Sequence, residues 1–160
     1  SVAGDGVFVA DGRSEITHCT IVNNGGGDGS GVHVNTDGSD YATVISLTNT
    51  ILVSHTVGIT VAEGGTATLQ GTLWGNETDW AGAGTIVTGT VNVSGNPDFV
   101  DPDGGNYHIS VHSAAVDAGV DAGVVTDIDG EERPMGFGPD IGADEVWRRI
   151  YSFYLPILHR

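Results

Sequence analysis

The chain has 160 residues, of which 26 are Gly, 21 are Asp or Glu and five are Arg, and with no Lys its formal net charge at pH 7 is −16. Proteins that bind nucleic acid cluster Lys and Arg to neutralise phosphates, and the five Arg residues here are scattered. Composition therefore disfavours nucleic acid as a partner and fits an exposed extracellular β-protein.

A short phrase recurs through residues 1–95. Gly6-Val7-Phe8-Val9 is followed by Gly31-Val32-His33-Val34, by Gly58-Ile59-Thr60-Val61 and, more loosely, by Gly84-Thr85-Ile86-Val87, at spacings of 25, 27 and 26 residues. Each copy alternates apolar residues with small or polar ones, which predicts a strand with one buried face. The regular spacing predicts about four repeats of one structural unit.

A second phrase lies between the copies of the first. It occupies residues 19–24, 49–54 and 71–76, and in each copy Thr is followed by Ile or Leu. Frequent glycines and β-branched residues disfavour helices here. We expect the asparagines near the turns to cap backbone groups or to form ladders between repeats.

Units of about 26 residues bury their apolar faces when each strand stacks on its counterpart in the next unit, about 4.8 Å away. The predicted fold is therefore all-β, a parallel β-helix or solenoid with about four coils. The predicted organisation is coils over residues 1–95, a closing segment over residues 96–146 and an apolar tail over residues 147–160.

The closing segment has its own pattern. Its phrases are Asn96-Pro97-Asp98-Phe99-Val100-Asp101, Tyr107-His108-Ile109, Ser113-Ala114-Ala115-Val116-Asp117-Ala118-Gly119, Thr126-Asp127-Ile128-Asp129-Gly130 and Asp140-Ile141-Gly142-Ala143-Asp144-Glu145. Residues 96–145 resemble the ending of bacterial choice-of-anchor Q proteins, a group in the pectate-lyase-like superfamily of right-handed parallel β-helices. The chain departs from that pattern at Ala114, where the family has proline, and at His108-Ile109. The resemblance implies a right-handed solenoid and a secreted or surface-exposed bacterial protein, and it implies no activity.

The tail is aromatic and apolar with basic flanks. Its apolar run, residues 150–158, is much shorter than the roughly 20 residues that cross a bilayer as a helix. We therefore expect no transmembrane segment. The tail is interpreted either as a strand that packs on the last coil or as a sorting signal.

Residues 127–131 alternate carboxylates around a glycine, as at the start of a calcium loop. The candidate ligands of a structural calcium ion are Asp127, Asp129 and Glu131. The resemblance to an EF-hand loop is partial, because Gly138 stands at the twelfth position, where that loop has an acidic ligand. The alternative is a tight turn in which Arg133 pairs with Asp127, Asp129 or Asp140.

No catalytic residue is assigned from the sequence. The phrase Asn35-Thr36-Asp37-Gly38 matches a short motif of polygalacturonases, but the adjacent aspartate pair of those enzymes, which supplies the second carboxylate for acid and base chemistry, is missing. Aromatic faces pack against sugar rings, and the candidate carbohydrate-binding residues are Trp74, Trp80 and Tyr41. Their alternative role is to cap the last coils.

Two functions fit these observations. The first is a non-catalytic structural, adhesion or surface-interaction module, the C-terminal part of a longer secreted β-helix. The second is a protein that binds or cleaves acidic polysaccharides, a lyase or glycoside hydrolase with its catalytic coils upstream. The chain has no initiator Met and its first coil begins almost at residue 1, so we expect its first strands to contact upstream coils or a second copy.

Overall fold

The computed structural model describes residues 5–24, 29–36 and 42–147, and these residues form strands and turns without a helix. Within them, no helix is long and apolar enough to cross a membrane. The first ten strands belong to two parallel sheets, and β11 (Phe99–Asp101) and β12 (Asn106–Ile109) form an antiparallel pair. The expected all-β class with parallel pairing is confirmed.

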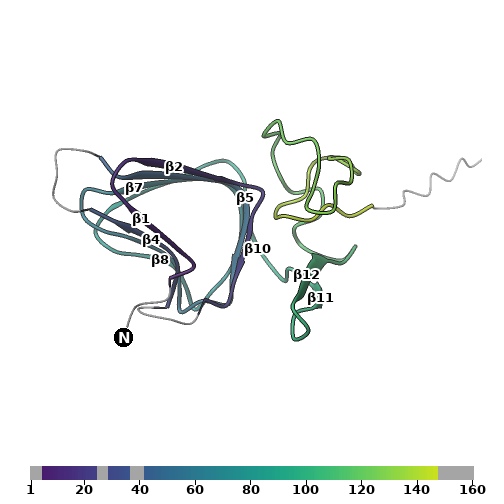
Figure 1. Cartoon of the computed structure of the whole chain (residues 1–160), viewed down its shortest axis with the longest axis horizontal. Helices are drawn as coiled ribbons and strands as arrows, with labels where there is room; N and C mark the ends of the chain where they lie inside the picture. Colours follow the sequence, from purple (N-terminus) through teal and green to yellow (C-terminus); the bar gives the residue numbers. More distant parts are fainter. Residues whose placement is uncertain (1–4, 25–28, 37–41, 148–160) are drawn as a thin grey trace, which may run out of the picture.

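The chain alternates between the two parallel sheets (Figure 1). The first sheet consists, in spatial order, of β1 (Val7–Ala10), β4 (Ser30–Asn35), β6 (Val57–Val61) and β8 (Thr78–Ala81). The second contains β2 (Arg13–Thr17), β3 (Thr20–Val22), β5 (Val44–Val53), β7 (Thr66–Gly75), β9 (Thr85–Thr88) and β10 (Asn92–Ser94). Because β2 and β3 both pair with β5, while β9 and β10 both pair with β7, each sheet is four levels deep.

The register of the first sheet follows the first repeated phrase through three copies. Val7 pairs with Val32, and Val32 pairs with Ile59, as the sequence alignment predicts. The predicted fourth copy is wrong, because Ile59 lies opposite Trp80, while Ile86 belongs to the second sheet. The short connection between β7 and β8 returns the chain to the first sheet before the fourth phrase is reached.

The second repeated phrase is shifted by one residue at its first copy. Thr20 pairs with Ile51 and Ile21 with Leu52, whereas the sequence alignment places Thr20 opposite Thr50. A shift of one residue exchanges the two faces of a strand, so Ile21, and not Thr20, points into the same space as Leu52. The predicted alignment of the second and third copies is confirmed by the pairs Thr50–Thr72 and Ile51–Leu73.

A bend in the second sheet explains this register. His18, Asn49 and Gly71 occupy equivalent positions in three successive levels, and their φ angles are 49°, 50° and 69°. This left-handed conformation is uncommon for residues other than glycine. At Gly71 it coincides with crowding, because a Cβ atom there would collide with the side-chain oxygen of Asn49. The bend therefore determines which residues of neighbouring levels pair with one another. The threonines that follow it do not determine this pairing.

Two apolar cores lie on either side of the second sheet. The first core, enclosed between the parallel sheets, is built from aliphatic residues of all four levels and Trp74; its buried members are Val9, Ile21, Val32, Val34, Ile45, Leu47, Leu52, Ile59, Val61, Ala67, Leu69 and Trp74. The second core joins the sheet to the closing segment; its buried members are Ile51, Val53, Leu73, Ile109, Ala115 and Ile141. Beyond the bend, the strands of the second sheet therefore carry apolar side chains on both faces.

The closing segment covers the flank of the second sheet (Figure 1). Residues from every level of that sheet contribute to the second core, including Val22 of β3 and Val93 of β10. Of the predicted tail, only Trp147 is described, and its side chain is 64% exposed. Residues 148–160 lie outside the described residues, so both interpretations of the tail stay predictions.

The first core predicts a large cost for truncating a central aliphatic side chain. Leu47 is fully buried, with Ile16 and Leu69 as its strand partners. Leu47→Ala should lower the free energy of unfolding by about 2–5 kcal/mol, because the cavity cannot collapse between two paired strands. Urea unfolding measures this, and Val125→Ala, at a position 71% exposed, is the matched control with an expected change within about 0.5 kcal/mol. Equal effects of the two variants would contradict the described core.

Candidate functional site

Arg133 is the buried cation of the closing segment. Its side chain is 1% exposed, and its Nη1 lies 3.1 Å from Oε2 of Glu145, whose side chain is fully buried. The guanidinium also donates to three carbonyl oxygens, those of Asp140, Gly142 and Ala143. A buried ion pair is stable only when its remaining donors and acceptors are satisfied, and this network satisfies most of them.

The sequence prediction for the partner of Arg133 is wrong. Asp127, Asp129 and Asp140 were its candidate partners, whereas the carboxylate that contacts it belongs to Glu145. Backbone amides occupy the carboxylate of Asp140, which accepts hydrogen bonds from the N–H groups of Asp117 and Val146. Burial raises the pKa of Asp140 to about 7, against the opposing effect of those two hydrogen bonds.

His18 connects Arg133 to the bend of the second sheet. Its Nδ1 lies 2.6 Å from Nη1 of Arg133, and its Nε2 lies 2.9 Å from Nδ2 of Asn49. Both neighbouring atoms are donor nitrogens, and the neutral ring can accept from only one of them, at the nitrogen that carries no proton. Hydrogen bonds with the backbone of Gly142 and Asp140 favour the charged form of the ring, but they are outweighed. Burial and the charge of Arg133 lower the pKa of His18 to about 4.

Asn49 anchors the closing segment through its amide. Its Oδ1 accepts a hydrogen bond of 2.8 Å from the backbone N–H of Val120, and its Nδ2 donates one of 2.6 Å to the carbonyl oxygen of Val120. Asn76 caps the backbone in the same manner, at the N–H of His55 and the carbonyl of Leu52. The expectation that asparagines near the turns cap backbone groups is confirmed at these two positions.

The predicted calcium loop is a turn closed by Asp127. Oδ1 of Asp127 accepts the backbone N–H groups of Asp129 and Glu131, and Oδ2 accepts that of Glu145. Both oxygens of Asp127 are therefore engaged with the backbone. Among the described residues, Asp127 and Glu131 do not belong to a group of three potential metal ligands, whereas Asp129 does.

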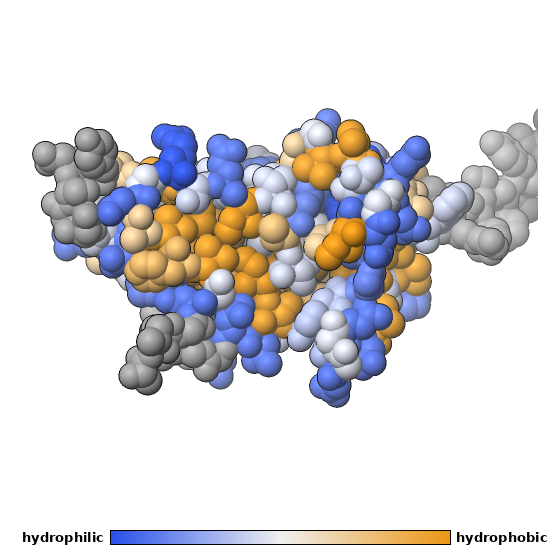
Figure 2. Space-filling view, viewed as in Figure 1, coloured by the Kyte–Doolittle hydropathy of each residue, from blue (hydrophilic) through white to orange (hydrophobic). Residues whose placement is uncertain are grey.

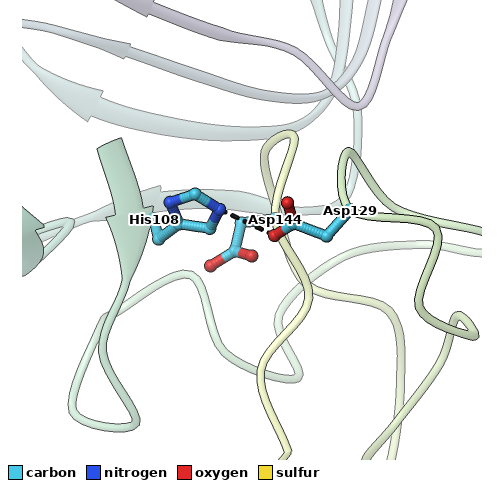
Figure 3. Close-up of side chains that lie close together, drawn as sticks. All are labelled: His108, Asp129 and Asp144. Carbon is cyan, nitrogen blue, oxygen red and sulfur yellow. Dashed lines mark hydrogen bonds and ion pairs between the residues drawn. The ribbon is translucent and has the colours of Figure 1, made fainter. Parts of the chain in front are cut away.

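That group consists of His108, Asp129 and Asp144 (Figure 3), whose ligand atoms lie within 4.8 Å of one another. The three residues come from β12, from the turn after Asp127 and from the end of the closing segment. His108 Nε2 is 2.7 Å from Oδ2 of Asp129. Oδ2 of Asp144 accepts the backbone N–H of Ile109 at 2.8 Å, and the Asp144 residue is only 7% exposed.

The electrostatics of this group follow from its two carboxylates. The hydrogen bond to Asp129 raises the pKa of His108, and the charges of Asp144, Asp129 and Asp127 act in the same direction. Burial raises the pKa of Asp144. An open cavity of about 480 Å³ borders the group and is lined by His108, Asp144, Tyr107, Ile128 and Thr20, among others.

The three predicted carbohydrate-binding residues do not form one described surface. Trp74 is 4% exposed and belongs to the first core, in the column of Ile21 and Leu52. Trp80 is 47% exposed and meets Trp74 edge to face, with ring centroids 5.7 Å apart. Tyr41 lies outside the described residues.

Comparisons with known proteins give no further identification. No family model, no curated protein and no solved structure matches the chain.

The buried ion pair predicts a large effect of removing its cation. Arg133→Met should lower the free energy of unfolding by about 3–5 kcal/mol, because it leaves the buried Glu145 carboxylate without a compensating charge. Glu131→Gln is the control, since Glu131 is exposed. Chemical unfolding of the two variants tests the prediction, and a loss below about 1 kcal/mol for Arg133→Met would contradict it.

His18 predicts a pH dependence of stability. Its pKa is lower in the folded protein, so between about pH 6.5 and pH 4 the unfolded chain binds the proton that the folded protein excludes. Stability due to His18 is present above pH 6.5 and is lost as the pH falls towards 4, by up to about 3 kcal/mol.

Comparison with His18→Asn isolates this effect, because Asn tolerates the left-handed backbone and does not titrate. We expect the wild type to lose stability relative to the variant between pH 7 and pH 4 in paired urea melts. Parallel curves over that range would contradict the assignment of a neutral His18.

Proposed function

We propose that the chain is a non-catalytic structural or surface-interaction module, the C-terminal part of a longer right-handed parallel β-helix. In this proposal the first strands bind a further coil, supplied by a parent chain or by a second copy. The resemblance of residues 96–145 supports the handedness and a secreted or cell-surface location in a bacterium.

The observation that carries the proposal is the open end of the first core. In the area enclosed by β1, β2 and β5, Figure 2 shows an apolar surface. Val7 and Ile16 of the end strands pack against the first core and remain partly exposed. A contiguous apolar area on a protein surface is a common mark of an interaction site.

The backbone at this end is also suited to pairing. β1 pairs with β4, and β2 and β3 pair with β5, so in the described part of the chain each has a strand on one side only. Edge strands of this kind accept another strand in register. A further coil with the same alternation would continue both the hydrogen bonds and the aliphatic columns.

The flank differs from this end, because the closing segment already covers it. The apolar residues of that interface are buried in the second core, and its buried charges belong to the network around Arg133. Within the described residues, these buried polar groups bind one another and the backbone, which supports a structural role for them.

The alternative is a polysaccharide-binding or polysaccharide-cleaving protein, and of its two described candidate rings only Trp80 is exposed. Trp74 is buried in the first core, so these two rings do not form a stacking strip. The interaction module is therefore the function that we favour.

The proposal predicts that the isolated chain self-associates through its first strands. Ile16→Lys should weaken association by about tenfold or more, because a charge enters the apolar contact. Glu15→Lys places the same side chain at the exposed neighbouring position, with a larger change of net charge because a carboxylate is also removed, and should leave association unchanged apart from the general effect of charge.

Sedimentation velocity over a concentration series measures this. We expect a reversible, concentration-dependent association of the wild type. A monomer at all concentrations, or equal weakening by the two substitutions, would contradict the proposed interface.

A further inference from the structure

The candidate ligands His108, Asp129 and Asp144 are brought together by the fold of the closing segment. Asp129 and Asp144 are held near β12 by backbone contacts: Ile128 donates its N–H to the carbonyl of Ala143, and Asp144 accepts the N–H of Ile109. Each candidate ligand is therefore adjacent in sequence to a residue whose backbone is hydrogen-bonded to a neighbouring segment. These backbone contacts, and not only contacts among the three side chains, determine where the ligands lie.

The orientation of His108 leaves Nε2 facing the carboxylates. Nδ1 of His108 contacts Oδ1 of Asn106, which lies two residues earlier. Because this amide oxygen is an acceptor, the contact keeps a proton on Nδ1. Histidines that bind metals through one nitrogen almost always donate the other ring N–H to an oxygen in this way. Without an ion, Nε2 donates its proton to Asp129, and a bound metal would take the place of that proton between Nε2 and the carboxylates of Asp129 and Asp144 (Figure 3).

Asp144 supplies an independent observation. It is 7% exposed, and its Oδ2 has the backbone N–H of Ile109 as a partner, while no Arg or Lys of the described residues forms an ion pair with it. A buried carboxylate without a permanent cation is costly, and a bound metal ion removes that cost.

We propose that His108, Asp129 and Asp144 bind a divalent transition-metal ion of the zinc class, with Asn106 as the residue that positions the histidine. One imidazole nitrogen and two carboxylate oxygens suit such an ion, whereas calcium takes six to eight oxygen ligands. The proposal is independent of the proposed function and differs from the predicted calcium loop, with which it shares only Asp129.

The geometry requires a small adjustment. Tetrahedral zinc with bonds of about 2.0–2.1 Å separates its ligands by about 3.3 Å, and the His108 to Asp129 distance is 2.7 Å. The side chains of His108 and Asp129 are 42% and 51% exposed, so they can move apart to admit the ion. The bordering cavity leaves a fourth position to water, as in sites with three protein ligands.

Calorimetric titration of the tag-free chain with Zn²⁺ tests the proposal, together with the visible absorption of Co²⁺ as a report on coordination geometry. We expect one site per chain with micromolar affinity and a tetrahedral Co²⁺ spectrum. His108→Gln and Asp144→Asn should each weaken Zn²⁺ binding by about 100-fold, and Asn106→Ala by about tenfold.

Two matched substitutions serve as controls: His112→Gln removes another exposed histidine, and Glu131→Gln removes a carboxylate of the predicted calcium loop. Both should leave affinity unchanged. His108→Gln changes a partly exposed side chain, so it remains informative if Asp144→Asn fails to fold. Absence of Zn²⁺ binding, or equal affinity of the wild type and His108→Gln, would overturn the proposal.

Discussion

The left-handed bend shared by His18, Asn49 and Gly71 is the constraint on which the rest of the structure depends. Before the bend, alternate residues such as Ile45 and Leu47 fill the first core. Beyond it, Leu52 continues the first core while Ile51 and Val53 face the closing segment. One backbone feature thus gives the second sheet an apolar surface on both sides.

The same positions carry the side chains that attach the closing segment. His18 contacts Arg133, and Asn49 forms two hydrogen bonds with Val120. At the third level, glycine leaves room for the Asn49 side chain. The bend therefore couples the shape of the sheet to the docking of residues that lie 71 and 115 positions away along the chain.

The sequence predicted the parts of this fold that depend on short-range alternation. The column Val7, Val32 and Ile59 was aligned correctly, because these strands keep a plain alternation of apolar and polar residues. The alignment of Thr20 failed because three chemically different residues share the bend, and matching threonines concealed that equivalence. Parallel stacking can be read from such patterns, whereas the position of a bend requires backbone conformation.

The buried polar residues were harder to predict for a related reason. Arg133 was expected to have a carboxylate partner, but the choice of Glu145 depends on a chain path in which backbone amides occupy nearer carboxylates. His108 and Asp144 are separated by 35 intervening residues without a recognised ligand spacing, so no local motif connects them. The one available signal was a histidine two residues after an asparagine, His108 after Asn106.

Amide hydrogen exchange of Asn49→Gly tests the role of this position most directly, because glycine keeps the left-handed backbone and removes only the side chain. Without the Asn49 side chain, the amide of Val120 should exchange about 10–100 times faster, because its acceptor is lost and the closing segment opens locally. The amides of Val34 and Val61, in the first sheet, should keep their protection. Unchanged exchange at Val120, or an equal loss of protection in the first sheet, would contradict the view that this position holds the closing segment to the stacked strands.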